Sequence, residues 1–137
     1  MNGSFSKYEL VPGTGALNVK ESLRPGDDLN KQGVKFDNDK VRYDLIPVEG
    51  PHAVAVILGI GAKKYAPRNW EQGMEWSRPY AAIQRHLQAW WGGEDLDPDT
   101  HKSHLWHVAC NAFFLIAYIA RGKGTDDRPT RSAGLSK

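Results

Sequence analysis

The pattern of apolar and polar positions is clearest between residues 77 and 121, where it predicts two helices joined by an acidic turn. Apolar residues recur at helical spacing on both sides of that turn. They are Tyr80, Ile83, Leu87, Trp90 and Trp91 in the first half, and Leu105, Val108, Ala109, Ala112, Phe113, Leu115, Ile116 and Ile119 in the second. Ser77 is placed to cap the first helix, and Gly122 is a usual C-terminal stop for the second.

A third helix is expected to begin near Pro51, because proline suits a first-turn position, and to run to about residue 65. Val54, Ile57 and Gly61 lie on one face of it. Gly59 and Gly61 each lower the helix propensity by about 1 kcal/mol relative to alanine. Such glycines also permit the close approach of another helix or of a ligand.

The end of this third helix is cationic, with Lys63 and Lys64 followed by Arg68. Cations at a helix C-terminus are stabilised by the helix dipole, which is one interpretation. The other is that they meet the oxygens of a polyphosphate. The residues alone do not decide between the two.

By composition the chain divides into three parts. Residues 1–33 show no sustained periodicity and are expected to be a flexible N-terminal arm that a partner subunit can order. Residues 34–122 form the predicted helical domain, with Trp70 and Trp76 packing its irregular connector, and residues 123–137 are expected to be a disordered tail. About 85 ordered residues make a marginal core on their own. The predicted fold class is therefore all-α, a small helical bundle completed by homo-oligomerisation.

Residues 35–47 differ from the rest of the N-terminal region, because their charges alternate and several aromatic or aliphatic residues stand between them. Arg42 and Tyr43 belong to this segment. In one interpretation it lies across the helices, with its aromatics as anchors and its charges aimed at a pocket. In the other it is a solvated turn with a hydrophobic latch.

Composition and charge exclude several classes of protein. A hydrophobic fraction of 40% and a charged fraction of 25% are those of a soluble globular protein, and a net charge of +2 argues for neither nucleic-acid nor membrane binding. No apolar run approaches the roughly 18 residues that span a bilayer, and no secretory signal opens the chain. A single cysteine, Cys110, excludes an internal disulfide and is expected to be a small buried hydrophobe. We expect a cytoplasmic protein.

The acidic turn is the first candidate for chemistry. It holds four carboxylates in six residues, Glu94, Asp95, Asp97 and Asp99. Hard divalent cations such as Mg²⁺ and Mn²⁺ need such clusters of oxygen ligands. Glu94 and Asp97 share one helical turn if the preceding helix continues that far, whereas a break at Gly92 and Gly93 makes Asp95 the alternative ligand. Glu71 or Glu75 is expected to complete the site. A solvated helix N-terminus is the simpler alternative.

Histidines flank the turn and are the second candidate. His104, His107 and Asn111 share one face of the last helix, and His86 lies two turns before Glu94. Neutral histidines ligate metals, act as general bases or donate to phosphates. Two histidines and a carboxylate also fit zinc, but the excess of oxygen donors favours magnesium or manganese. Each histidine taken singly is as well explained as a satisfied bundle residue.

Carboxylates for a metal and cations for phosphate oxygens make phosphoryl hydrolysis the coherent reaction class. The chain contains no Walker loop, no GxGxxG motif and no nucleophile elbow.

Several ordered motifs between residues 35 and 121 resemble the dATP/dGTP diphosphohydrolases of phages and bacteria. They are Lys40-Val-Arg42-Tyr43-Asp44-Leu45-Ile46-Pro47, Gly61-Ala-Lys63-Lys64-Tyr65, Arg68-Asn69-Trp70-Glu71-x-Gly73, Arg85-His86-Leu87, Gly93-Glu94-Asp95-x-Asp97 and His104-Leu105-x-His107-x3-Asn111. That family is similar to the MazG-like all-α nucleotide pyrophosphohydrolases. The chain departs from the MazG-like pattern, because only Glu94-x-x-Asp97 has the spacing of its paired acids.

The resemblance implies metal-dependent cleavage of a purine deoxynucleoside triphosphate, dGTP or dATP, to the monophosphate and pyrophosphate. For a phage-encoded enzyme the site of action would be the host cytoplasm. Phage members are linked to pathways that replace adenine with 2-aminoadenine, where dGTP hydrolysis supplies dGMP. A homodimer or homotetramer is expected.

Together these considerations give a hypothesis for the site. The metal ligands, for Mg²⁺ or Mn²⁺, are Glu94, Asp97, Asp95 and Glu71. The residues that transfer protons are His104, His107 and His86. The substrate is contacted by Lys63, Lys64, Arg68, Asn69, Asn111 and Arg42, and Trp90 or Tyr43 stacks on the purine. Two alternatives remain: a non-catalytic helical interaction module, and a zinc hydrolase that uses the three histidines.

Overall fold

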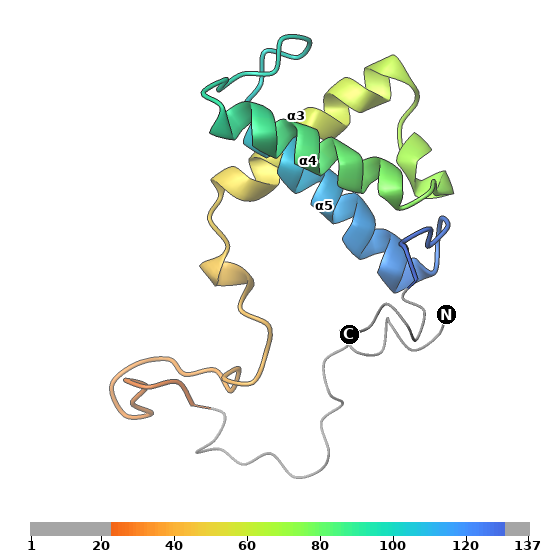
Figure 1. Cartoon of the computed structure of the whole chain (residues 1–137). Coiled ribbons are helices and arrows are strands. Elements are labelled where there is room, and N and C mark those ends of the chain that lie inside the picture. The colour runs from red at the N-terminus through yellow and green to blue at the C-terminus, as the bar shows by residue number, and fades with distance from the viewer. Residues whose placement is uncertain (1–22, 131–137) are drawn as a thin grey trace, which may run out of the picture. The chain divides into compact units, whose positions relative to one another are not determined.

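The computed structural model describes residues 23–130, which fall into two compact units, 23–46 and 47–130. The second unit contains three α-helices and one short 3-10 helix (Figure 1). They are α3 (Glu49–Lys64), η2 (Asn69–Gln72), α4 (Ser77–Trp91) and α5 (His104–Arg121). Among the described residues β-pairing is limited to two isolated bridges, Glu75 with Thr125 and Leu96 with Ser103. The predicted all-α class and small helical domain are confirmed.

Helices α4 and α5 form an antiparallel hairpin, and α3 packs across α5 (Figure 1). The buried cluster between α3 and α5 consists of Val54, Ile57 and Cys110. Leu58, Ile60, Trp106, Ala109 and Phe114 pack around it. Cys110 is buried as expected, and its burial raises the pKa of the thiol to about 11. This apolar contact fixes α5, on which the polar residues of interest are carried.

The helix boundaries differ from the predictions in two places. Helix α3 begins at Glu49, so Pro51 lies inside the first turn, where a missing N–H costs no intrahelical bond. Ser77 is not the cap of α4 but its first residue, and both its N–H and its hydroxyl donate to the carboxylate of Asp127. An acidic side chain from beyond α5 thus occupies the place of the cap, which suits the helix dipole.

Residues 123–127, which were expected to begin a disordered tail, are hydrogen-bonded to the connector before α4. The N–H of Trp76 donates to the carbonyl of Thr125 at 3.0 Å, and the N–H of Thr125 donates to the carbonyl of Met74 at 3.2 Å. Gly73 and Gly124 stand where these backbones meet, both with positive φ. A Cβ on Gly73 would lie 2.6 Å from the nitrogen of Gly124. The two backbones can approach this closely because Gly73 and Gly124 have no side chains. The contact does not depend on a repeating apolar pattern, so the sequence analysis did not predict it.

Large apolar side chains remain exposed on the helices. Phe113 and Ile116 are 50% and 64% exposed on α5, and Trp91 is 84% exposed on α4. Their exposure agrees with the small core that was expected. Completion of the bundle by a second copy, and its likeness to MazG-type bundles, stay predictions. No helix among residues 23–130 has the length and apolar content needed to cross a membrane.

The unit of residues 23–46 contains one 3-10 turn, η1 (Tyr43–Leu45). Arg24 and Asp37 form an ion pair at 2.7 Å. Arg42 donates two hydrogen bonds to Asp44, at 2.8 and 2.7 Å, and these lower the pKa of the Asp44 carboxyl to about 2. The Arg42 guanidinium is thus paired within its own segment, and its role toward a substrate stays a prediction. Residues 1–22 and 131–137, most of the expected arm and the end of the tail, lie outside the described residues.

Candidate functional site

The loop of residues 92–103 joins α4 to α5 and positions the acidic side chains. Helix α4 ends at Trp91, so the condition under which Glu94 and Asp97 share a helical turn is not met, and the alternative of a break at Gly92 and Gly93 holds. Gly92 and Gly93 follow, and Gly93 has a φ of 102°, which favours glycine. The loop is closed by hydrogen bonds from the N–H of Asp97 to the carbonyl of Lys102 and from the N–H of His101 to the carbonyl of Asp97, both at 2.8 Å. Backbone pairing, not helical spacing, brings the carboxylates to the start of α5.

Asp97 is held in one orientation by the loop. Its Oδ1 accepts hydrogen bonds from the N–H groups of Asp99 at 2.8 Å and Thr100 at 3.0 Å. Burial would raise the pKa of this carboxyl, but the two N–H groups and the nearby His107 and His86 hold it below its usual value. The group is therefore a carboxylate at neutral pH. Its second oxygen, Oδ2, lies 3.8 Å from Nδ1 of His86.

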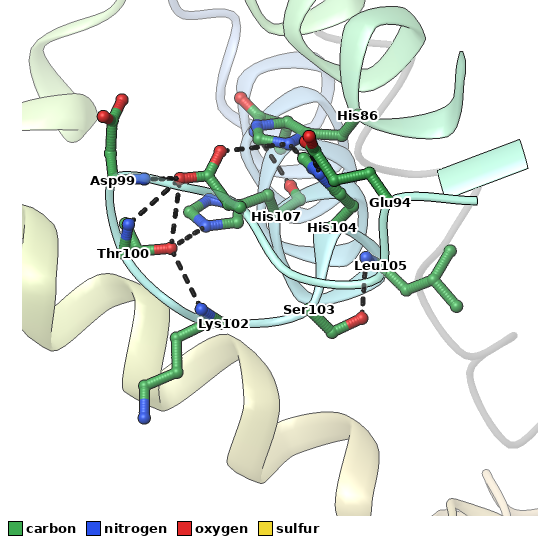
Figure 2. A network of polar contacts seen from close by, with 11 residues as sticks. His86, Glu94, Asp99, Thr100, Lys102, Ser103, His104, Leu105 and His107 are labelled. Atoms are coloured by element: carbon green, nitrogen blue, oxygen red, sulfur yellow. Dashed lines mark hydrogen bonds and ion pairs between the residues drawn. The ribbon is translucent and has the colours of Figure 1, made fainter. Parts of the chain in front are cut away.

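Three histidines meet at this end of the hairpin (Figure 2). His86 comes from the penultimate turn of α4, and His104 and His107 from the first turn of α5. The Nδ1 atoms of His86 and His104 are 2.8 Å apart. The rings of His86 and His107 are stacked, with centroids 4.4 Å apart and an angle of 7° between the planes. His104 and His107 were predicted to share one face of α5, and that face is turned toward His86 of α4.

His104 is the most buried of the three, with 3% of its surface exposed. Its Nε2 lies 2.7 Å from Oε1 of Glu94, whose side chain is 52% exposed (Figure 2). A carboxylate only accepts hydrogen bonds, so the proton of the His104 ring belongs on Nε2. The lone pair of Nδ1 then faces His86. Glu94 orients the ring and fixes its tautomer.

His107 is bound on the other side of the cluster by a residue that the sequence patterns did not single out. Its Nε2 lies 2.7 Å from the hydroxyl of Thr100, which also contacts Oδ1 of Asp97 (Figure 2). Burial lowers the pKa of His107, and burial together with the nearby His107 lowers that of His86, so both rings are neutral at pH 7. The run Asp97-Pro98-Asp99-Thr100 is a turn sequence in which an Asp side chain binds backbone N–H groups two and three residues on. That signal was available to find Thr100.

Three of these side chains lie close enough together that they could hold one metal ion. One nitrogen of His86, one of His104 and one carboxylate oxygen of Asp97 all lie within 4.8 Å of one another. Two of the three are histidines that were predicted to transfer protons, whereas Asp97 was predicted as a ligand. Glu94 is near but bound to His104, and Asp95 is exposed, its carbonyl accepting from the N–H of His104 at 3.1 Å.

Glu71 lies at the other end of the hairpin. Its Oε1 accepts from Arg68 at 3.1 Å and from Arg121 at 3.2 Å. Arg121 closes α5 and His104 opens it, so a rise of 1.5 Å per residue separates their backbones by about 25 Å. Within one chain, therefore, Glu71 does not share a metal ion with Glu94 and Asp97. Arg68 is used in the same ion pair.

The other expected substrate residues are spread over the helical unit. Lys63 and Lys64 are exposed in the last turn of α3, and Asn69 is exposed at the start of η2. Asn111 is turned back to its own helix, its side-chain amide donating to the carbonyl of His107 at 2.8 Å. Trp90 is partly exposed one turn after His86. Asn111 is the one of these residues with a described hydrogen bond to His86, His104 or His107.

An open hollow of about 400 Å³ is lined by Leu87, Gln88, Trp91 and Gly92 at the end of α4. None of these residues belongs to the histidine cluster. The lining of this hollow is apolar apart from Gln88 and includes no titratable side chain. The candidate catalytic and metal-binding groups are therefore those of the histidine cluster.

Comparisons with known proteins match most of the chain. A family model described as "dATP/dGTP diphosphohydrolase, N-terminal" matches residues 30–128, which include all three helices and the loop. A protein of Salmonella phage PMBT28 named dATP/dGTP diphosphohydrolase is 33% identical over 96 residues, which are 70% of this chain. Those residues are 33% of that protein, so the chain spans about one third of its length. No solved structure matches. The chain belongs to the family of dATP/dGTP diphosphohydrolases, in the part that the family model describes as N-terminal.

Proposed function

We propose that this chain takes part in the metal-dependent hydrolysis of purine deoxynucleoside triphosphates, dGTP and dATP, to the monophosphate and pyrophosphate. The observation that carries the proposal is the convergence of His86, His104 and Asp97 on one point at the end of the hairpin. The name of the phage relative supports the substrate class. Because the matched residues are only 33% of that relative, the activity of the whole protein is part of the proposal.

The residues of this chain have distinct tasks in the proposed reaction. A divalent ion such as Mg²⁺ or Mn²⁺, when bound, neutralises phosphate charge and lowers the pKa of a bound water. Asp97 and Asp95 offer carboxylate oxygens toward it, and Glu94 holds the ring of His104. His107 is neutral and hydrogen-bonded to Thr100, so it is able to accept a proton from the attacking water. Trp90 offers an aromatic face for the purine.

The phosphate-binding cations require a second copy of the chain or a further segment of a longer protein. Lys63, Lys64, Arg68 and Asn69 do not contact the cluster within one chain, and Arg42 and Tyr43 belong to the separate unit of residues 23–46. We propose a homodimer or homotetramer in which the exposed apolar residues of α5 are covered. Leu105, Phe113 and Ile116 carry this surface.

The proposed setting follows from the relative. A phage-encoded enzyme would act in the host cytoplasm. Hydrolysis of dGTP would yield dGMP, which a pathway that makes 2-aminoadenine nucleotides requires as a precursor.

The test is product analysis after the chain is incubated with each of the four dNTPs and Mg²⁺ or Mn²⁺. Monophosphate and pyrophosphate from dGTP or dATP are expected. Diphosphate with phosphate, or nucleoside with tripolyphosphate, would overturn the proposed bond cleavage. The double variant Glu94→Gln, Asp97→Asn should lose at least about 100-fold in kcat/KM, since such losses are usual when metal-site residues and their partners are changed. Asp99→Asn is the matched control, because only the backbone N–H of Asp99 is used in the loop.

A non-catalytic helical interaction module is the second candidate. It is favoured by the exposed apolar residues of α4 and α5 and by the coverage of only one third of the relative. It predicts no turnover of any dNTP with any divalent ion. It also predicts that the chain binds the remaining two thirds of the phage relative when that part is expressed separately.

A further inference from the structure

We propose that the nitrogen atoms Nδ1 of His86 and Nδ1 of His104 and the oxygen atom Oδ2 of Asp97 bind one divalent transition-metal ion, with Zn²⁺ as the best fit. Glu94 stays outside the coordination shell as the hydrogen-bond acceptor of His104. The inference rests on the proposed function for its biochemical setting, but it assigns a nitrogen-rich site in place of the all-carboxylate magnesium or manganese site that was expected from the sequence. Its test does not require hydrolysis.

The three donor atoms are brought together by three different elements. His86 comes from α4, Asp97 from the loop and His104 from α5. Their donor atoms lie within 4.8 Å of one another. In a tetrahedral site with Zn–ligand bonds of about 2.1 Å, two ligand atoms lie about 3.4 Å apart. The two Nδ1 atoms are 2.8 Å apart and Nδ1 of His86 lies 3.8 Å from Oδ2 of Asp97, so side-chain shifts of about half an ångström bring these pairs to that spacing. Ligands from separate elements also mean that the site forms only in the folded chain.

In two of the three ligands the second polar atom is already bound to another residue, so the atom that faces the other ligands is the one available to a metal. Nε2 of His104 is bound to Glu94 at 2.7 Å. Oδ1 of Asp97 accepts from Asp99 and Thr100, so Oδ2 is the oxygen that faces His86. A carboxylate behind a ligating imidazole is the usual outer arrangement of zinc sites, because it fixes the tautomer and raises the basicity of the nitrogen.

The types of donor decide which metal is preferred. Mg²⁺ prefers an octahedron of oxygen atoms and retains several waters. Two imidazoles and one carboxylate suit Zn²⁺ and neighbouring transition metals, and three protein ligands leave a position open for water or a phosphate oxygen. Burial of His104, and of most of His86 and Asp97, limits competition from solvent. The metal site is therefore of the kind found in hydrolytic zinc centres.

A hydrogen-bonded chain without metal is the alternative explanation of the same contacts. In that case Nδ1 of His86 donates to Nδ1 of His104, and the carboxylates serve only to orient the rings. The two explanations differ in whether a purified chain retains a stoichiometric ion, and that difference can be measured directly.

The experiment measures zinc binding by the full chain, without any nucleotide. The protein is stripped with a chelator, dialysed against ZnCl₂ in the presence of millimolar MgCl₂, and analysed for bound metal by elemental analysis. One zinc per chain is expected, and Co²⁺ in its place should give the visible absorption of a four-coordinate site. Retention of no zinc after dialysis would overturn the inference.

Variants locate the site. His86→Gln and Asp97→Asn keep similar size, and each should weaken zinc binding by more than about 100-fold; Glu94→Gln should weaken it by about 10–100-fold, as outer partners do. His101→Asn is the matched control: it removes a histidine from the same loop, asparagine tolerates its φ of 58°, and zinc affinity should not change. Equal zinc binding by His86→Gln and the control would show adventitious binding and overturn the site. Circular dichroism of each zinc-free variant confirms folding.

The outcomes separate this inference from the proposed function. Zinc bound at His86, His104 and Asp97 without turnover of any dNTP supports the site and contradicts the hydrolysis. Turnover with Mg²⁺ by a protein that retains no zinc after dialysis supports the hydrolysis and contradicts the site.

Discussion

The two ends of the α4–α5 hairpin are built from different kinds of contact. At the end where α5 begins, histidines and carboxylates meet side chain to side chain, and several of their polar atoms face one another across short distances. At the other end, aromatic side chains bind backbone carbonyls. Trp76 donates to the carbonyl of Lys123 at 2.9 Å, and Tyr118 donates to the carbonyl of Trp70 at 2.6 Å.

The two ends of the α4–α5 hairpin therefore differ in what their polar groups can do. At the aromatic end the ring N–H of Trp76 and the hydroxyl of Tyr118 are bound to backbone carbonyls, which do not titrate. The carboxylate of Glu71 is already paired with Arg68 and Arg121. At the histidine end the neutral rings of His86 and His107 and the carboxylate of Asp97 are groups that a metal or a proton can use. The aromatic end is expected to hold the fold, and the histidine end to carry the function.

The largest effect on stability is expected from Trp76→Ala at the aromatic end. Trp76 is buried, donates through both its backbone N–H and its ring N–H, and lies under the guanidinium of Arg128. Its truncation should lower the free energy of unfolding by about 3–5 kcal/mol, measured by urea denaturation. Trp91→Ala is the control, because Trp91 is exposed, and it should change that free energy by less than about 0.5 kcal/mol. Equal losses from both variants would show that the exposed stripe of α4 is covered in solution.

A smaller loss is expected from Gly124→Ala, also at the aromatic end. Gly124 has a φ of 75°, and an added Cβ would collide with the carbonyl oxygen of Met74. The strain should cost about 1–3 kcal/mol of unfolding free energy. The same substitution at Gly59, inside α3 with open space around it, should instead stabilise the protein by up to about 1 kcal/mol. A loss at Gly59 would reveal a close contact with another chain, which the glycines of α3 were expected to permit.

The smallest effect concerns the histidine end. The hydroxyl of Ser103 accepts from the N–H of Leu105 at 3.1 Å and caps α5, which places His104 next to the loop. Ser103→Ala should cost about 1 kcal/mol, whereas Ser103→Gly should cost only a few tenths, and thermal unfolding of the two variants compares them. If Ser103→Ala costs as much as Trp76→Ala, the histidine end holds the fold as well, and the division between the ends fails.

Much of the fold was predictable because it follows from local spacing. The three helices are where apolar periodicity and the stop at Gly122 place them, and the buried state of Cys110 follows from its position inside that pattern. The candidate residues of the histidine end were also recognisable. His86, Glu94, Asp97, His104 and His107 were singled out by residue type, and the structure brings them together.

Their division of labour was not predictable, because it depends on which atoms face each other. Periodicity gave Glu94 and Asp97 the same role, whereas the loop directs Asp97 to His86 and Glu94 to the far nitrogen of His104. The placement of Glu71 was also not predictable. Glu71 was expected to share a metal site with Glu94 and Asp97, but the connector between α3 and α4 places it at the C-terminal end of α5, next to Arg121.

The amino-acid sequence by itself determined the helices, the small core, the family and the set of polar residues, because each depends on residue type and on spacing within a single segment. Only the tertiary structure decided that residues 123–127 bind the connector before α4, that Asp127 replaces Ser77 as a cap, and that His86 meets His104 and Asp97. These contacts join segments that are distant in sequence or lie on different elements. Their geometry is set by the packing of α5 against α3 and α4, which local pattern does not encode.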